Sequence, residues 1–367
     1  MATMKISEVI NKLELWAPPS LQENYDNAGL ICGNSQQNIT GALTCLDSIE
    51  ETIDEAVRLN CNLIVAHHPI VFKGLKKITG KSYVERTIIK AIKNDICIYA
   101  MHTNLDSITT GVNYKIGNLL GISKPTILDP QKGTLEKLVT YCPVKNSENL
   151  RNKLFEGGAG KIGNYDSCSF NTEGLGTFRG LENSNAFVGE KLKMHQEKEY
   201  KIEVIYDKHL RENLINILNK FHPYEEVAYE IYNVENENNY IGAGMIGDLD
   251  QEMELHNFFD LLKKIFHLKV IKYSGKTNKK VKRIAWCGGS GSFLLQNSIK
   301  KKADVFITGD CKYHEFFDHE NKVIIADIGH YESEQFTIDL IANFLKENFN
   351  KFAVHLSVVN SNPVNYY

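Results

Sequence analysis

The sequence has no two cysteines close enough in the chain to form a metal-binding or redox motif. Its eight cysteines occur singly, and no pair has the Cys-x-x-Cys spacing. This excludes a zinc knuckle and a thioredoxin-like site, both of which need closely spaced thiols. Several of them lie within apolar runs, where a thiol behaves as a small hydrophobic group. The eight cysteines are Cys32, Cys45, Cys61, Cys97, Cys142, Cys168, Cys287 and Cys311.

Long apolar runs are also absent. Nowhere does the chain have the roughly 18 consecutive apolar residues that a membrane-spanning helix needs. The first residues, MATMKISEVINKLELW, are typical of a short amphipathic helix and contain no signal-peptide core. Together with the scattered cysteines, these patterns predict a reduced, soluble, cytoplasmic protein.

Neither sign of charge dominates the sequence. The chain has 42 Lys and Arg against 45 Asp and Glu, a formal net charge of −3. This balance gives no overall reason to expect nucleic acid or an anionic membrane as a partner. One basic stretch, KTNKKVKR (276–283), is open to two interpretations, a local basic patch or a solvated linker before a strand.

At 367 residues the chain is longer than a typical single domain. In its first third, short apolar runs alternate with longer amphipathic ones. The predicted strands are GALTCLD, NLIVAHHP and ICIYAMHTNLD, and the predicted helices between them are EETIDEAVRLN and SYVERTIIKAIKND. This β-α-β-α-β order predicts a parallel sheet with helices on its faces.

The middle of the chain has a different order of elements. Four predicted strands, KLVTYCPV, YDSCSFNTEGLGTF, EYKIEVIYD and EEVAYEIYNV, enclose the predicted helices NSENLRNKLFEGGA and HLRENLINILNKF. Two β-α-β units in succession are typical of a ferredoxin-like split β-α-β domain.

From IGAGMIGDL onward the α/β pattern returns. We therefore predict an α/β protein with a three-layer α/β lobe built from both chain ends, residues 1–126 and 245–367. Residues 127–244 are predicted to form an inserted ferredoxin-like α+β domain.

Three predicted strands of the lobe end in ionisable side chains. In parallel α/β sheets, loops converge at the carboxyl ends of strands, so residues far apart in sequence meet there. The segments are IVAHHP, IYAMHTNLD and IIADIGHYESE, and their ionisable residues are His67 and His68, His102 and Asp106, and His330 and Glu334.

Imidazoles combined with carboxylates suit a divalent ion such as zinc, manganese or iron, without any thiolate. Five or six such groups exceed the needs of one tetrahedral ion, which favours two ions about 3.5–4 Å apart. Each segment also has an ordinary interpretation: a core histidine pair, a turn capped by Asp106, or the first turn of a helix. These three interpretations would have to hold together, so we favour the metal site.

Two further motifs are ambiguous. CGGSGSF (287–293) joins a predicted strand to a predicted helix and could present N–H groups to a phosphate, or it could only allow close packing. TGDCKYHE (308–315) could line the metal cavity or form a helix cap with a structural histidine.

The motifs QENYDNAGL, VAHHPIVF, HTNLD, TGDCKYHE and DIGHYESE, in this order, resemble the Ngg-interacting-factor-3-like family. Its members are widely described as GTP cyclohydrolase 1 type 2 homologues. The middle portion, with GAGKIGNYDSCSF and FHPYEEVAYEIY, resembles the version of the family that carries an inserted PII-like domain.

The resemblance implies a dinuclear centre that binds two divalent metal ions as cofactors. It also implies a homohexamer, a trimer of dimers with the metal sites facing an internal cavity. His102 is implied as a neighbouring catalytic proton carrier. The implied ligands are His67, His68, Asp106, His330 and Glu334, with Glu334 as the bridge.

Two functions are consistent with these residues. The first is a metal-dependent hydrolase of a nucleotide or another phosphorylated small molecule, which attacks either a purine ring or a phosphoester. The second is a non-enzymatic metal-binding protein or a regulatory scaffold that senses a small ligand through the insert. The ligand set is the same for both.

Overall fold

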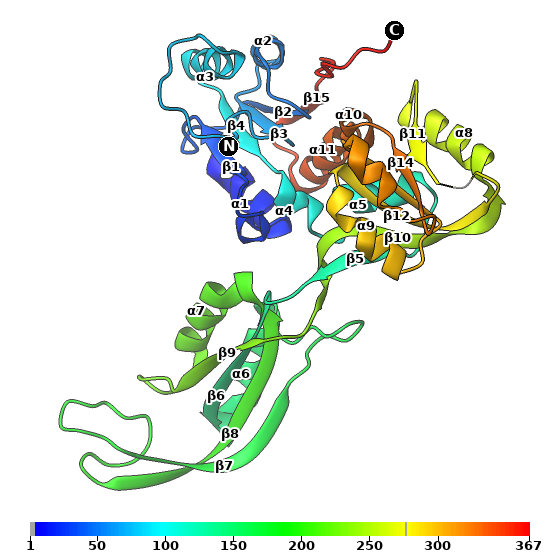
Figure 1. The fold of residues 1–367 in the computed structure, drawn as a ribbon. Helices are drawn as coiled ribbons and strands as arrows, with labels where there is room; N and C mark the ends of the chain where they lie inside the picture. Colours follow the sequence, from blue (N-terminus) through cyan, green and yellow to red (C-terminus); the bar gives the residue numbers. More distant parts are fainter. Residues whose placement is uncertain (1–3, 276) are drawn as a thin grey trace. The chain divides into compact units, whose positions relative to one another are not determined.

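The computed structural model describes residues 4–275 and 277–367, so Lys276 of the basic stretch lies outside the described residues. The chain divides into two compact units (Figure 1). Unit 1 comprises Met1–Asp129 and Tyr240–Tyr367, and unit 2 comprises Pro130–Asn239. Within the described residues, no helix combines the length and hydrophobicity that a membrane crossing requires.

The first sheet of unit 1 has five strands in the order β1-β4-β3-β2-β15. Its strands are β1 (Gly29–Cys32), β2 (Gly41–Cys45), β3 (Leu63–Ala66), β4 (Cys97–Ala100) and β15 (Ala353–Leu356). All neighbours are parallel except β1, which pairs antiparallel with β4. The predicted parallel arrangement of the strands GALTC (β2), LIVA (β3) and CIYA (β4) is therefore confirmed.

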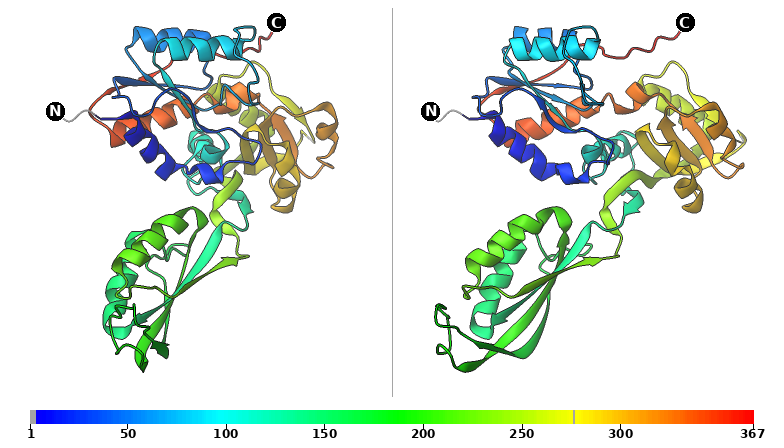
Figure 2. Two further views of the ribbon diagram at one scale, coloured as in Figure 1. Left: turned by 90° about the vertical axis from the view of Figure 1, so that its left-hand side faces the viewer. Right: turned by 60° about the vertical axis from the view of Figure 1, so that its left-hand side comes forward.

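Both faces of this sheet are covered by helices (Figure 2). Alternate strand residues such as Leu43 and Ile64 pack with Ile53 and Ile88 on one face. The next residues along the strands enter a larger core on the opposite face. The helices are α2 (Glu50–Arg58) and α3 (Tyr83–Lys93) on the first face, and α1 (Ile6–Trp16) and α11 (Thr337–Asn348) on the second.

The second sheet of unit 1 has six strands in the order β11-β14-β13-β12-β10-β5. β12, β13 and β14 are parallel, whereas β10 and β11 are antiparallel to their neighbours. Its elements are β5 (Thr126–Gln131), β10 (Asn238–Glu254), β11 (Lys272–Ser274), β12 (Lys280–Ser290), β13 (Val305–Gly309) and β14 (Ile324–Asp327), with helices α5 (Val112–Leu119), α8 (Leu255–Phe266) and α9 (Leu295–Lys300).

Unit 1 is therefore α/β as predicted, but it is not a single three-layer lobe, because it contains two sheets. Of the later described strands, β15 joins an edge of the first sheet, whereas β10 to β14 belong to the second sheet. One hydrophobic core joins the two sheets, since residues such as Val65 and Tyr99 of the first share it with Trp286 and Ile307 of the second.

Unit 2 has the order β-α-β-β-α-β and one four-stranded antiparallel sheet, β7-β8-β6-β9. This is the arrangement of a ferredoxin-like fold. Its core lies between the sheet and two helices and includes Leu138, Ile202, Leu150 and Leu214. The elements are β6 (Leu135–Pro143), α6 (Val144–Glu156), β7 (Phe170–Arg179), β8 (Met194–Asp207), α7 (Arg211–Phe221) and β9 (Tyr229–Val234).

The boundaries of unit 2 lie three and five residues inside the predicted positions 126 and 245. The reason is that β5 and β10 run past these positions before the chain changes unit. Ile127, Leu128 and Ile241 are buried and belong to the cores of unit 1.

A buried carboxylate of unit 2, Glu136, is fully paired within the unit. Glu136 on β6 is fully buried and accepts hydrogen bonds from the Tyr206 hydroxyl (2.8 Å) and from Nε of Arg211 (2.8 Å). A second bond from Arg211 Nη2 makes the pair bidentate. Burial raises the pKa of Glu136, but the bonds from Arg211 and Tyr206 outweigh it and lower the pKa below its usual value.

Candidate metal centre

Two histidines follow β3 at the end of the first sheet. His67 is completely buried, whereas a fifth of the His68 side chain is exposed. Their backbone N–H groups continue the strand pairing, donating to the carbonyls of Cys45 and Leu46. Successive strand residues face opposite ways, but the turn that begins here brings both rings into one cluster, with centroids 4.8 Å apart.

The other predicted residues arrive from the ends of two more strands. β4 is followed by His102 and the short helix α4 (Thr103–Asp106), and β14 by the short helix α10 (His330–Glu334). The turn before α10 passes through Gly329 with φ of +92°, a backbone conformation that suits glycine. His330 and Glu334, four residues apart, consequently lie on the same face of α10.

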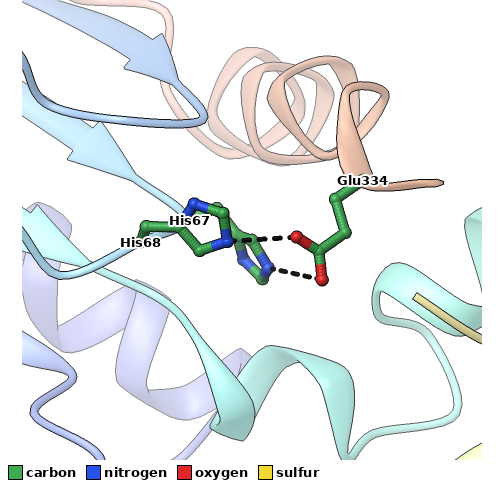
Figure 3. Close-up of side chains that lie close together, drawn as sticks. All are labelled: His67, His68 and Glu334. Atoms are coloured by element: carbon green, nitrogen blue, oxygen red, sulfur yellow. Dashed lines mark hydrogen bonds and ion pairs between the residues drawn. The ribbon is translucent and has the colours of Figure 1, made fainter. Parts of the chain in front are cut away.

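The predicted ligands converge on the Glu334 carboxylate, and Figure 3 shows His67 and His68 beside it. Its Oε1 lies 3.7 Å from His67 Nε2, and its Oε2 lies 3.0 Å from His68 Nε2. His330 Nε2 is 3.1 Å from the same Oε2. Asp106 Oδ1 is 3.8 Å from His67 Nε2. The structure thus brings together all five residues that the sequence predicts as ligands.

Two polar atoms in the cluster lack a hydrogen-bond partner within the described part of the chain. These buried atoms are His67 Nε2 and Asp106 Oδ1. His67 Nδ1 lies 2.8 Å from the Met101 carbonyl oxygen, which can only accept, so Nδ1 donates to it and a neutral ring presents a lone pair at Nε2. This lone pair and a carboxylate oxygen that faces it repel, and a cation between them, either a proton or a metal ion, removes the repulsion. His67, His68 and Glu334 have ligand atoms within 4.8 Å of one another, close enough to hold a metal ion.

The other three histidines at the site, His68, His102 and His330, also use Nδ1 for a supporting contact, which leaves Nε2 for the site. Their partner is a carboxylate oxygen, where His67 has a carbonyl oxygen. These contacts join His68 to Asp47 (2.8 Å), His102 to Asp26 (2.7 Å) and His330 to Asp310 (2.7 Å). A carboxylate that orients the far nitrogen is the usual support of a metal-bound histidine.

The sequence did not identify these supporting aspartates. Asp26 lies within the motif QENYDNAGL and Asp310 within the ambiguous motif TGDCKYHE, and neither motif indicates that its aspartate contacts a histidine. Asp47 gave no signal beyond its place directly after a strand. A search for carboxylates within a few residues of strand ends would have found Asp47 and Asp310, but not which histidine each one orients.

The carboxylates of this site favour positive charge on the groups around them. Burial and, after it, the charge of Glu334 raise the pKa of Asp106 to about 7. Burial lowers the pKa of His68, but its bonds to Asp47 and Glu334 outweigh this and raise it to about 10. In the same way, the bonds of His330 to Glu334 and Asp310 raise its pKa to about 9. The cluster therefore attracts positive charge.

The CGGSGSF motif packs against the cluster and does not offer its N–H groups to a phosphate. Gly288, Gly289 and Gly291 donate to Asn113 Oδ1, Ser333 Oγ and Thr308 Oγ1 respectively. A Cβ at Gly289 would collide with Glu334 Oε1. Close packing is therefore the better of the two interpretations.

The last residues of the chain contact the cluster from behind. Ser361 Oγ donates to Asp47 Oδ2 (2.5 Å), whose other oxygen lies beside His68. Asn362 Nδ2 donates to Glu332 of α10 (3.2 Å). The segment thus contacts the residue that supports His68 and the helix that carries His330 and Glu334. The sequence analysis did not predict this role.

A cavity of about 600 Å³ opens beside the cluster, large enough for a small-molecule substrate. Its lining includes four of the five predicted ligands (His68, Asp106, His330 and Glu334) and the predicted proton carrier His102. His67 lies behind them and is fully buried.

Comparisons with known proteins match this chain to one family over nearly its whole length. The sequence matches the family described as Duf34/NIF3 (NGG1p interacting factor 3) over residues 4–363. A Halalkalibacterium halodurans protein named GTP cyclohydrolase 1 type 2 homolog is 38% identical over 332 residues, which cover 89% of each chain. A Staphylococcus aureus protein of the same name is 33% identical and covers 99% of this chain and 100% of its own. The crystal structure of a Bacillus cereus protein related to NIF3 is 33% identical and covers all of both chains, with a TM-score of 0.87.

Proposed function

Since the chain belongs to the Duf34/NIF3 family, we propose that it holds two divalent metal ions and hydrolyses a nucleotide or another phosphorylated small molecule. The ligands in this proposal are His67, His68, Asp106, His330 and Glu334. The name GTP cyclohydrolase 1 type 2 homolog, carried by the relatives, fits hydrolysis of a purine nucleotide.

The observation that supports metal binding best is a pair of buried atoms, His67 Nε2 and Asp106 Oδ1, which lie 3.8 Å apart and have no hydrogen-bond partner among the described residues. The two oxygens of Glu334 support a pair of ions. Oε1 faces His67, whereas Oε2 faces His68 and His330. A carboxylate between two groups of ligands is suited to bridge two ions.

When bound, divalent ions supply Lewis acidity and lower the pKa of water, which creates a nucleophile at neutral pH. Among the chain's own groups, His102 is placed to move a proton. It lines the cavity, and Asp26 accepts a hydrogen bond from its Nδ1, which leaves Nε2 to exchange protons with a substrate. Burial raises the pKa of Asp26, but the bonds from His102 and Thr103 lower it to about 2, so this carboxylate stays charged and keeps the imidazole oriented.

The alternative is a metal-binding or regulatory scaffold without catalysis, in which unit 2 senses a ligand as a PII-like domain. The cavity of about 600 Å³ next to the cluster favours the hydrolase, because a storage or structural site has no need of space for a substrate. The PII-like identity of unit 2 and the homohexamer remain proposals from the family resemblance, and the mass of the protein in solution tests the latter.

The test combines metal analysis of freshly purified protein with a screen of GTP and generic phosphodiesters. We expect two ions per chain in the wild type, and loss of at least one ion and of any hydrolysis in Glu334→Ala. His256→Asn, which changes an exposed histidine on α8, serves as the control. Circular dichroism of each variant distinguishes loss of metal from loss of fold. Metal-free wild-type protein, or metal-loaded protein that hydrolyses none of these compounds, would contradict the proposal.

A further inference from the structure

Three exposed aromatic rings line the cavity beside the candidate metal centre. Tyr25, Phe72 and Phe293 are 64%, 46% and 65% exposed. Large aromatic side chains stabilise a fold mainly by burial, so rings that stay this open contribute little to stability. Exposed apolar groups at a cavity often belong to a binding site.

The backbone that carries Tyr25 is fixed by its neighbours. Next to it, Asp26 accepts hydrogen bonds from the backbone N–H (3.1 Å) and hydroxyl (2.5 Å) of Thr103 and contacts His102. Asn27 Nδ2 donates to the Val71 carbonyl (2.6 Å), which ties the Tyr25 segment to the residue before Phe72. The backbone segments that carry the two rings are therefore held in place before a ligand binds, which lowers the entropy cost of binding.

The geometry of the rings allows both to contact one flat ligand. The centroids of Tyr25 and Phe72 are 6.2 Å apart and their planes are inclined at 49°, so a flat ring that stacks on one of them meets the other with its edge. Phe72 also lies 6.2 Å from the ring of His102, nearly at right angles. The aromatic pair thus stands directly beside the predicted proton carrier.

We propose that Tyr25 and Phe72 bind a planar aromatic heterocycle of the substrate, a nucleobase or a ring of similar size, with one ring stacked on its face and the other against its edge. This inference rests on the proposed function and gives it a substrate class. Stacking holds the ring next to His102 and leaves the attached sugar and phosphate within the same cavity as the ligand cluster. It favours a nucleotide over a phosphoester that has no aromatic ring.

The test compares two probes that differ only by the base, guanosine 5′-monophosphate and ribose 5-phosphate, by calorimetry on the full-length protein. We expect the nucleotide to bind at least about tenfold more tightly. Tyr25→Leu and Phe72→Leu should each weaken nucleotide binding about tenfold to a hundredfold, the range typical of lost base stacking. Binding of ribose 5-phosphate and the metal content should not change.

Matched variants sharpen the result. Phe72→Tyr keeps an aromatic face and should retain the preference for the nucleotide. Tyr83→Leu removes another exposed ring, on α3 and outside the cavity lining, and should have no effect. Equal affinity for both probes, or Leu variants that bind like the wild type or lose both probes equally, would overturn the proposal. So would a change in the mass of the Leu variants in solution, because the rings would then mediate contact between copies.

These outcomes are separate from those that test hydrolysis. The preference for the base can be measured with a chelator present, so it reports on the aromatic pair even if the protein binds no metal. Conversely, a metal-loaded hydrolase without a base preference would retain the proposed function and overturn only the stacking.

Discussion

The two units each bury a carboxylate, and they satisfy it differently. In unit 2, Glu136 is matched by the hydroxyl of Tyr206 and the guanidinium of Arg211. In unit 1, Glu334 is shared among three imidazoles, and two buried atoms close to it have no partner within the described residues. A buried carboxylate whose hydrogen-bond partners all come from its own chain stabilises the fold. A buried polar network that lacks some of its partners costs stability, unless a bound ion or ligand supplies them.

The largest expected effect comes from removing a ligand of the incomplete network. Asp106→Asn should weaken binding of at least one ion by more than about 100-fold, beyond the range typical of changes in supporting residues. The metal-free variant should unfold at the same temperature as the metal-free wild type or higher, because a buried charge beside Glu334 is gone. Metal titration and thermal unfolding with a chelator measure the two effects. A large loss of stability in the metal-free variant would mean that Asp106 serves the fold.

A substitution in the Glu136 network of unit 2 should lower stability and leave metal binding unchanged. Glu136→Gln removes the charge that pairs with Arg211 and should destabilise unit 2 by about 2 kcal/mol, without changing metal content. Because the folded-state pKa of Glu136 is lowered, its stabilising effect is present above the unfolded pKa and is lost as the pH falls through the folded value. Denaturant unfolding at pH 7 and at pH 3 should therefore show a smaller difference between wild type and variant at the lower pH.

The control for this prediction is Glu230→Gln, which changes an exposed carboxylate of the same sheet that contacts the Tyr141 hydroxyl. It should change stability by less than about 0.5 kcal/mol. Equal effects of the two substitutions would remove the distinction between a buried charge network and a surface contact.

Removing a supporting carboxylate should have an intermediate effect. Asp47→Asn keeps the shape of the side chain but weakens the orientation of His68, so metal affinity should fall about 10-fold to 100-fold. Asp54→Asn, an exposed aspartate that pairs with Lys90, is the control. Competition with a metal-sensitive dye measures both variants, and affinities that match the wild type would show that Asp47 does not tune the site.

The smallest effect is expected one step further from the cluster. Ser361→Ala removes one hydrogen bond to Asp47, worth about 1 kcal/mol, and should weaken metal binding about fivefold. Ser357→Ala is a matched control, because Ser357 bonds to Glu55 and does not contact Asp47. If both variants bind metal equally well, the C-terminal segment does not support the site.

The elements of the fold were largely predictable, whereas their grouping into sheets was not. Strands such as Leu63–Ala66 and Val305–Gly309 are continuous apolar runs, typical of strands buried on both faces. Such runs carry no information about which sheet a strand joins. That choice depends on edge strands, and the chain fills one edge of the first sheet with β15, from its far end.

The same limit applies to the candidate site. Histidines directly after apolar strands are conspicuous, so His67, His68, His102 and His330 could be identified from sequence. Their supporting aspartates were not, because an aspartate after a strand is also a common turn residue. Whether it faces an imidazole depends on tertiary packing.

The distribution of the cluster along the chain has a consequence for biosynthesis. His68 and Glu334 meet across 266 positions of sequence, and β15, which pairs with β2 at the other end of the chain, follows later still. During translation the histidines after β3 leave the ribosome long before the glutamate that joins them is made. The nascent protein can fold unit 2 in the meantime, since its strands and helices are contiguous in sequence. The candidate metal centre must be among the last features to form, and a metal ion that arrives earlier meets only three of the five proposed ligands.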